Sequence, residues 1–122
     1  MHTPLWTPSP ERVASCAMTQ FRARAAALAG RDLPDQAALY AWSLAEPGAF
    51  WRLLWDEAGV IGEPGDVALA PGATMREARW FPEGRLNVAE NLLRRRDDGE
   101  ALVFCGEGQV ERRLSWAELH QQ

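Results

Sequence analysis

The residues that could carry acid–base chemistry are few in this chain and do not form a recognisable set. The only histidines are His2, near a terminus that is expected to fray, and His120, on the outward side of a predicted helix. Imidazole is well suited to proton transfer near neutral pH, but these positions argue against a ligand or base role. Glu83, Glu90 and Glu118 pair with no other carboxylate at a spacing that suits acid–base catalysis. We therefore assign no catalytic residue.

Serine hydroxyls are the candidate nucleophiles, and three of them have a structural explanation instead. Ser9, Ser43 and Ser115 each precede a predicted helix, where a hydroxyl accepts a hydrogen bond from a free backbone amide. Ser43 and Ser115 are each followed three residues later by a glutamate, which is the pattern of a capping box. The sequence therefore contains no plausible activated nucleophile.

Glycines, cysteines and arginines likewise predict no cofactor or metal site. The glycines of 62–65 and 106–108 lack the Gly-Lys-Ser/Thr continuation of a phosphate-binding loop and predict turns. Cys16 and Cys105 are too few for a disulfide framework and lack zinc spacing. We expect both to be small buried residues in a reducing compartment. The basic run 94–96 is followed by two aspartates, which favours a solvated helix end over a phosphate site.

Composition limits the classes of partner. The chain has 122 residues, 47% of them hydrophobic and 25% charged, which is typical of one globular domain. A net charge of −4 argues against binding to nucleic acid or to an anionic membrane. The first residues lack the regions of a secretory signal, and no apolar run approaches the ~20 residues of a membrane helix. We expect a soluble cytoplasmic protein.

Helix signals dominate the elements that would position these residues. Ser9 followed by Pro10 begins a first helical region, which breaks near Cys16 and ends at Gly30. Asp35 caps a second helix. A strong third helix follows.

The third helix has the clearest pattern in the chain. The capping box 43–46 and then Pro47 predict its start, and Gly59 predicts its end. Apolar residues spaced three and four apart predict one buried face. These residues are Phe50, Trp51, Leu54, Trp55 and Ala58.

A further helix start lies within an unusual corner, residues 80–93. Asn87 is placed as an N-cap, and Glu90 three residues later completes a capping box with Asn in place of Ser or Thr. The apolar residues that follow predict a buried face. They are Val88, Ala89, Leu92 and Leu93.

Six tryptophans are unusually many for a chain of this length. Trp42, Trp51 and Trp55 lie at helical spacing, which favours a core stripe over docking to another domain. Helix periodicity does not explain Trp80 and Phe81, which precede a turn. Core packing and domain docking remain equal alternatives for that pair.

The rest of the chain predicts a loop, a hairpin and a short helix. Residues 60–78 are rich in Gly and Pro and predict an ordered loop, with a short extended piece at 67–69. Residues 101–105 and 110–114 predict a β-hairpin, and the capping box 115–118 begins a helix that stops at Gln122. A hairpin and two helical turns have little stability alone. We therefore expect the opening segment of a larger α/β protein.

These signals predict an α+β fold with two parts. Residues 1–96 would form a mainly helical module of four to five helices, with the Gly/Pro loop at 60–78. Residues 97–122, the hairpin and the start of a helix, would belong to a large domain that is not in this sequence.

The ordered motifs along the chain resemble the N-terminal region of acetoacetyl-CoA synthetases, a branch of the acetyl-CoA synthetase family. The motif Leu86-Asn87-Val88-Ala89-Glu90-Asn91 is similar to the acyl-CoA synthetase N-terminal region in general, whereas Pro4-Leu5-Trp6-Thr7-Pro8 and Trp80-Phe81-Pro82 favour the acetoacetyl branch. The other matching segments are Ala49–Trp51, Leu54–Asp56, Ile61–Gly65, Ala78–Arg79, Leu92–Leu93 and Leu114–Leu119.

The resemblance implies an adenylate-forming acid–thiol ligase, and it implies that residues 97–122 belong to the large AMP-binding domain of such an enzyme. Such enzymes use ATP, magnesium and CoA to make an acyl-CoA through an acyl-adenylate. Their phosphate loop, adenine motif, ribose-binding Asp and C-terminal lysine have no counterpart here, and this chain has no lysine. We therefore carry over no catalytic or binding residue and expect no activity from this chain alone.

Two functions remain open at this point. The first is a structural N-terminal module that docks on the remainder of an acetoacetate–CoA ligase. The alternative is a stand-alone module that binds a partner protein through a tryptophan-rich surface.

Overall fold

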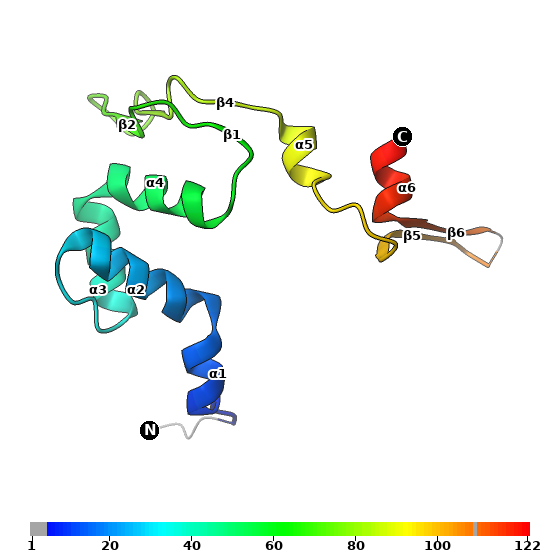
Figure 1. The fold of residues 1–122 in the computed structure, drawn as a ribbon, viewed down its shortest axis with the longest axis horizontal. Helices are drawn as coiled ribbons and strands as arrows, with labels where there is room; N and C mark the ends of the chain where they lie inside the picture. The colour runs from blue at the N-terminus through cyan, green and yellow to red at the C-terminus, as the bar shows by residue number, and fades with distance from the viewer. Residues whose placement is uncertain (1–4, 109) are drawn as a thin grey trace. The chain divides into compact units, whose positions relative to one another are not determined.

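The computed structural model describes residues 5–108 and 110–122. These residues contain six helices and three two-stranded antiparallel sheets, joined by loops (Figure 1). Five helices precede the long hairpin and one follows it, so the predicted α+β class is confirmed. The helices are α1 Pro10–Ser15, α2 Ala17–Ala29, α3 Gln36–Ala45, α4 Pro47–Glu57, α5 Val88–Leu92 and α6 Trp116–Gln121. The strands are β1 Gly62–Glu63, β2 Leu69–Ala70, β3 Arg79–Trp80, β4 Arg85–Leu86, β5 Glu100–Gly106 and β6 Val110–Ser115.

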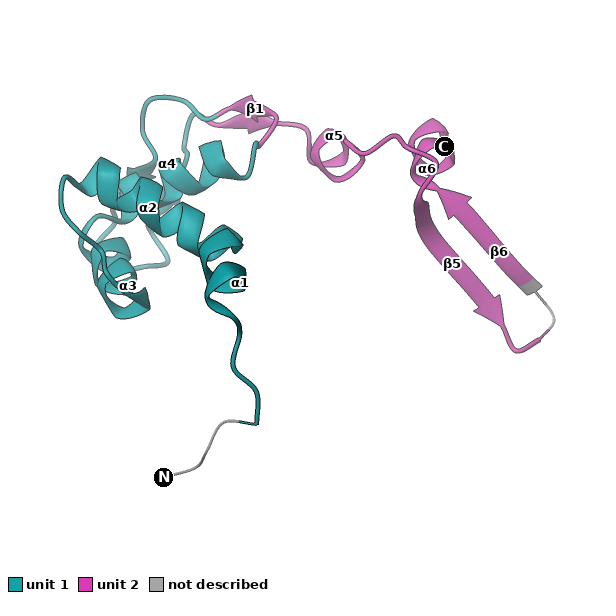
Figure 2. Ribbon diagram, turned by 60° about the horizontal axis from the view of Figure 1, so that its bottom comes forward, with its two compact units in different colours: residues 1–59, 64–83 teal, residues 60–63, 84–122 magenta. Residues whose placement is uncertain are grey.

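The chain divides into two compact units (Figure 2). Unit 1 comprises residues 1–59 and 64–83, and unit 2 comprises residues 60–63 and 84–122. The division predicted from the sequence, between residues 96 and 97, concerns domains of a longer enzyme and stays a prediction.

The core of unit 1 lies where α2, α3 and α4 contact one another. Its centre is four apolar residues, of which Trp42 is only 2% exposed. The other three are Ala25, Leu33 and Leu39. Partly buried side chains surround them, among them Phe21, Ala49, Phe50 and Leu53. Trp42 is therefore a core residue, as the helical spacing predicted.

The starts and ends of α1, α2 and α3 follow the predicted signals. The Ser9 hydroxyl accepts a hydrogen bond from the Arg12 amide, and the helical region breaks at Cys16. Gly30 ends α2 with φ of +64°, a left-handed conformation in which glycine has no Cβ to strain. The Asp35 carboxylate accepts from the Ala38 amide at 2.8 Å and caps α3.

The capping box predicted at 43–46 is wrong. Helix α3 runs on to Ala45, so Ser43 lies inside it and its hydroxyl donates to the Tyr40 carbonyl at 2.8 Å. Glu46 alone separates α3 from α4, which begins at Pro47 as predicted. Leu39 and Trp42 of α3 are buried in the core of unit 1, and packing of this helix outweighs the local capping preference at Ser43.

Two short sheets occupy the predicted loop 60–78 and the corner after it. In unit 1, β2 pairs with β3, with Leu69 opposite Trp80. In unit 2, β1 pairs with β4, with Gly62 opposite Leu86. The predicted extended piece at 67–69 is thus a strand that begins two residues later, at Leu69. The partner strands were not predicted, because each has only two residues.

The predicted hairpin is confirmed, and α6 follows it directly. Strands β5 and β6 pair from Gly106 opposite Val110 to Glu100 opposite Ser115, with an irregularity between Glu100 and Leu102. At the start of α6, the Ser115 hydroxyl accepts from the Glu118 amide and the Glu118 carboxylate accepts from the Ser115 amide. This capping box is present as predicted.

Candidate functional site

The residues first considered for acid–base chemistry have structural partners or face solvent. Glu118 belongs to the α6 capping box, and the Glu83 carboxylate accepts from the Asp66 amide at 3.1 Å. His120 is exposed on α6, whereas His2 lies outside the described residues. Within 5–108 and 110–122, no three His, Cys, Asp or Glu side chains are grouped so that they could hold a metal ion.

Both cysteines are exposed, so the prediction that they are buried is wrong. Cys16 stands at the break between α1 and α2, where its sulfur lies 3.2 Å from the Thr19 hydroxyl. That hydroxyl, and then the Thr19 backbone amide, lower the pKa of the Cys16 thiol. Cys105 lies on β5, in a two-stranded sheet whose side chains are largely open to solvent.

The two unexplained aromatics, Trp80 and Phe81, pack on helix α4 within unit 1. The Phe81 ring lies 4.9 Å from the Trp55 ring, centroid to centroid, and the Trp80 ring lies 5.6 Å from Trp51 in an edge-to-face arrangement. Such pairs contribute about 0.5–1.5 kcal/mol beyond the area they bury. Trp51 and Trp80 nevertheless keep part of their surface in solvent. The corner therefore attaches the β2–β3 strands to α4.

Backbone geometry fixes Phe81 at this position. Its φ is +44°, which is unusual for an aromatic residue, and its amide donates to the Ala68 carbonyl at 2.9 Å. The hydrogen bond and the Trp55 contact hold Phe81 in this left-handed conformation. The chain consequently turns sharply after β3 while the ring stays on α4.

A second set of contacts joins the loop 64–66 to helix α4 within unit 1. The Arg52 guanidinium, on α4, donates to the Gly65 carbonyl and, at 3.3 Å, to the Asp66 carbonyl. Gly65 has φ of +72°, and a Cβ there would lie 2.6 Å from the Glu83 Cβ. The close approach and the positive φ together explain why this position is glycine.

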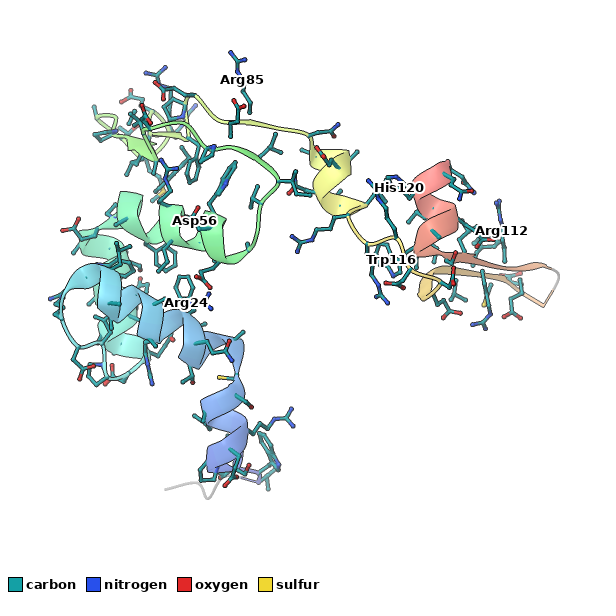
Figure 3. All side chains as sticks on the ribbon, in the orientation of Figure 1. Arg24, Asp56, Arg85, Arg112, Trp116 and His120 are labelled. Atoms are coloured by element: carbon teal, nitrogen blue, oxygen red, sulfur yellow. The ribbon has the colours of Figure 1, made fainter. Side chains whose placement is uncertain are left out.

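An apolar groove of about 670 Å³ lies among α2, α3 and α4 of unit 1. Phe21, Leu39, Tyr40, Phe50 and Leu54 line it, with further residues of the same three helices. Arg24, which is labelled in Figure 3, lies on α2 at the rim of the groove. Its guanidinium forms an ion pair with the Glu57 carboxylate on α4. Nothing in this lining provides a nucleophile held by a base, so the groove has the chemistry of a binding surface.

In unit 2, the Asn91 side chain joins α5 to the start of β1. Its carbonyl oxygen accepts from the Ile61 amide at 2.8 Å, and its amide donates to the Ile61 carbonyl at 2.8 Å. It also donates to the Asn87 carbonyl at 2.9 Å. We call these contacts the Asn91 clamp. The second Asn of the motif 86–91 therefore has a structural role that the sequence reasoning missed.

The predicted capping of α5 is only half present, and its predicted buried face is wrong. The Asn87 side chain accepts from the Glu90 amide at 3.3 Å. Within the described residues, the Glu90 carboxylate makes no return hydrogen bond to Asn87. Val88 is 62% and Leu92 is 69% exposed. The short helix of unit 2 thus presents exposed apolar side chains.

The turn 95–99 joins α5 to the hairpin and α6. The Arg95 side chain donates to the Asp97 carboxylate, and its guanidinium lies 5.5 Å from the centre of the Trp116 ring. The Asp97 carboxylate also accepts from the Gly99 amide at 2.8 Å. The three arginines 94–96 are exposed, as predicted, but they follow α5, which ends at Leu92, and do not lie in the last turn of a helix.

Comparison with known proteins identifies related chains. Residues 36–92 match the family model described as acetyl-coenzyme A synthetase N-terminus. The sequence is 47% identical to the acetoacetyl-coenzyme A synthetase of Rhizobium meliloti over 116 residues, which are 95% of this chain and 18% of that protein. It is 31% identical to the acetoacetyl-CoA synthetase of Macaca fascicularis over 122 residues, 97% of this chain and 18% of the relative. No solved structure matches the chain.

A relative from the acetyl branch matches a shorter part of the chain. The acetyl-coenzyme A synthetase of Bradyrhizobium diazoefficiens is 33% identical over 94 residues, which cover 69% of this chain and 14% of that protein. The chain therefore spans less than a fifth of the length of the curated relatives it matches. No helix among the described residues is long and apolar enough to cross a membrane.

Proposed function

Because this chain carries an acetyl-coenzyme A synthetase N-terminal domain and is homologous to the N-terminal portion of acetoacetyl-CoA synthetases, we propose that it is the docking module of an acetoacetate–CoA ligase. Its role is to fold as a scaffold and to bind the remainder of the synthetase. The complete enzyme would join acetoacetate to CoA with ATP and magnesium and release AMP and pyrophosphate. We place this module in the cytoplasm.

The observation that carries the proposal is the exposed apolar face of α5. Val88 and Leu92 are exposed although the Asn91 clamp holds the helix in place. Surface apolar residues on an anchored helix favour a protein partner. The family model ends at residue 92, where α5 also ends, so the exposed face lies inside the family region.

Catalysis by this chain alone is not part of the proposal. Adenylyl transfer requires clustered groups that stabilise the charge on phosphates. The groove in unit 1 is apolar, and its rim charges Arg24 and Glu57 neutralise each other. Acetoacetate, ATP and CoA are therefore assigned to the parts of the synthetase beyond the matched region.

The alternative of a stand-alone module that binds through tryptophans has less support. Trp42 is buried, and the rings of Trp55 and Trp51 contact Phe81 and Trp80. These contacts take up part of the surface that a tryptophan-mediated interface would use.

A chimera tests the proposal. This chain would replace the matched region of the Rhizobium meliloti synthetase, and acetoacetate-dependent release of pyrophosphate would be measured. We expect activity from the chimera and none from the 122-residue chain alone. A Val88→Glu, Leu92→Glu chimera should lose activity, whereas Met75→Glu, a change at an exposed residue of unit 1, should not. Turnover by the isolated chain, or full activity of the double variant, would refute the proposal.

A further inference from the structure

Strand β5 has one edge without a neighbour. Among the described residues it pairs with β6 and with no other strand. An isolated two-stranded hairpin is of marginal stability in water, and a third strand or an additional packing surface is generally required. Backbone amides and carbonyls along the free edge are therefore available to another strand.

The side chains make β5, and not β6, the edge suited to pairing. No charged residue occurs from Ala101 to Gly106. Leu102 and Phe104 are 51% and 61% exposed. By contrast, β6 carries Glu111, Arg112 and Arg113 in succession, and charged residues protect a strand edge from adding another strand.

We propose that the free edge of β5 pairs antiparallel with β5 of a second copy of this chain. With Val103 opposite its counterpart, Leu102 of each copy lies opposite Phe104 of the other. The pairing is then two-fold symmetric and brings no like charges together, because the paired segment has no charge. The only acid of β5, Glu100, is at its end and forms an ion pair with Arg113 of the same hairpin.

The contrast between the uncharged β5 and the charged β6 limits the assembly to a dimer. The resulting sheet has the order β6–β5–β5–β6, so its outer edges are the charged β6 strands. An isologous contact that uses the same edge twice closes on itself and leaves no second edge of that kind. Four strands also give the hairpin the neighbours that two strands lack. This inference does not depend on the proposed function.

Sedimentation equilibrium of the 122-residue chain tests the pairing. We expect a monomer–dimer equilibrium, which Val103→Lys weakens by about tenfold or more because it places a charge at the paired edge. The control is Val67→Lys, at an exposed valine of unit 1 outside the strands, and it should leave the equilibrium unchanged. A chain that remains monomeric at its highest soluble concentration overturns the inference and leaves the edge to a strand of the remaining synthetase. Open polymers, or a dimer insensitive to Val103→Lys, also overturn it.

A second measurement keeps β5 unchanged apart from a label, in case Val103→Lys unfolds the hairpin. In the Cys16→Ser protein, a spin label is attached to Cys105, which is exposed. The pairing predicts about 14 Å between the two Cys105 Cα atoms, four residues along the strands and one strand spacing across. A short interspin distance that disappears on dilution supports the inference. A dimer with only long distances contradicts it.

Discussion

The rings of Phe81 and Trp55 lie 4.9 Å apart, centroid to centroid, and join the corner after β3 to helix α4. These residues are 26 positions apart in the sequence, so the contact spans the whole Gly/Pro loop. The Trp-Phe-Pro corner therefore packs inside unit 1. From the sequence, packing and docking to another domain were equal alternatives for this corner.

Phe81→Ala should destabilise unit 1 by about 1–3 kcal/mol, because the ring and its contact with Trp55 are lost at a half-buried site. Urea unfolding followed by tryptophan fluorescence measures the change. Met75→Ala, at a residue that is 93% exposed, serves as the control and should stay within about 0.5 kcal/mol of the parent protein. Equal effects of the two substitutions would mean that the corner does not hold unit 1 together.

Substitution of two glycines by alanine separates the effect of backbone conformation on stability from the effect of crowding. Gly30→Ala adds a Cβ at φ of +64° with no atom within 4 Å, so only the left-handed backbone costs about 1–2 kcal/mol. Gly65→Ala adds the same strain and a Cβ 2.6 Å from the Glu83 Cβ. It should therefore destabilise more than Gly30→Ala in thermal unfolding of the same protein. The reverse order would contradict the close approach of Gly65 to Glu83.

Asn91→Leu should loosen the segment at Ile61, because the clamp hydrogen bonds disappear and leave the Ile61 amide and carbonyl without these partners. Leaving backbone hydrogen-bonding groups without partners in this way costs about 1–3 kcal/mol. Hydrogen exchange at the Ile61 amide should become faster. Glu90→Ala is the matched control on α5, since its carboxylate makes no return hydrogen bond in the described residues. Exchange at Ile61 that is unchanged in Asn91→Leu would refute the clamp.

The turn 95–99 should depend on pH in a defined direction. Hydrogen bonds from Arg95, and then from the Gly99 amide, lower the pKa of the Asp97 carboxyl. The folded pKa lies below that of the unfolded chain, so the stabilisation is present above the ordinary carboxyl pKa of about 3.9. It is lost as pH falls through the lowered folded pKa. Carboxyl NMR titration should show this low midpoint, and Arg95→Gln should move it back up. A midpoint that Arg95→Gln leaves in place would contradict the assigned cause.

Sequence patterns predicted elements whose stability is local and missed those that depend on distant residues. The caps at Ser9, Asp35 and Ser115 involve residues three positions apart, and all three are present. Ser43 has the same local pattern but lies inside α3, because packing of that helix with Trp42 at its core takes precedence.

The position of the proposed docking surface could not be predicted from the sequence. Local periodicity identified an apolar face on α5, yet it could not show whether this chain covers that face. The face is exposed, whereas the tryptophans suspected of docking pack on one another or in the core. Likewise, the Asn91 clamp pairs residues 30 positions apart, which no spacing rule in the sequence indicates.

Hydrogen exchange at Val88–Leu92 tests the docking account most directly. It would be compared between the isolated 122-residue chain and the chimera with the Rhizobium meliloti synthetase. We predict slower exchange in this segment in the chimera, with little change in α2 and α3, because the remainder of the synthetase covers α5. Exchange at Val88–Leu92 that is equally fast in both proteins would contradict the claim that this helix is a docking surface.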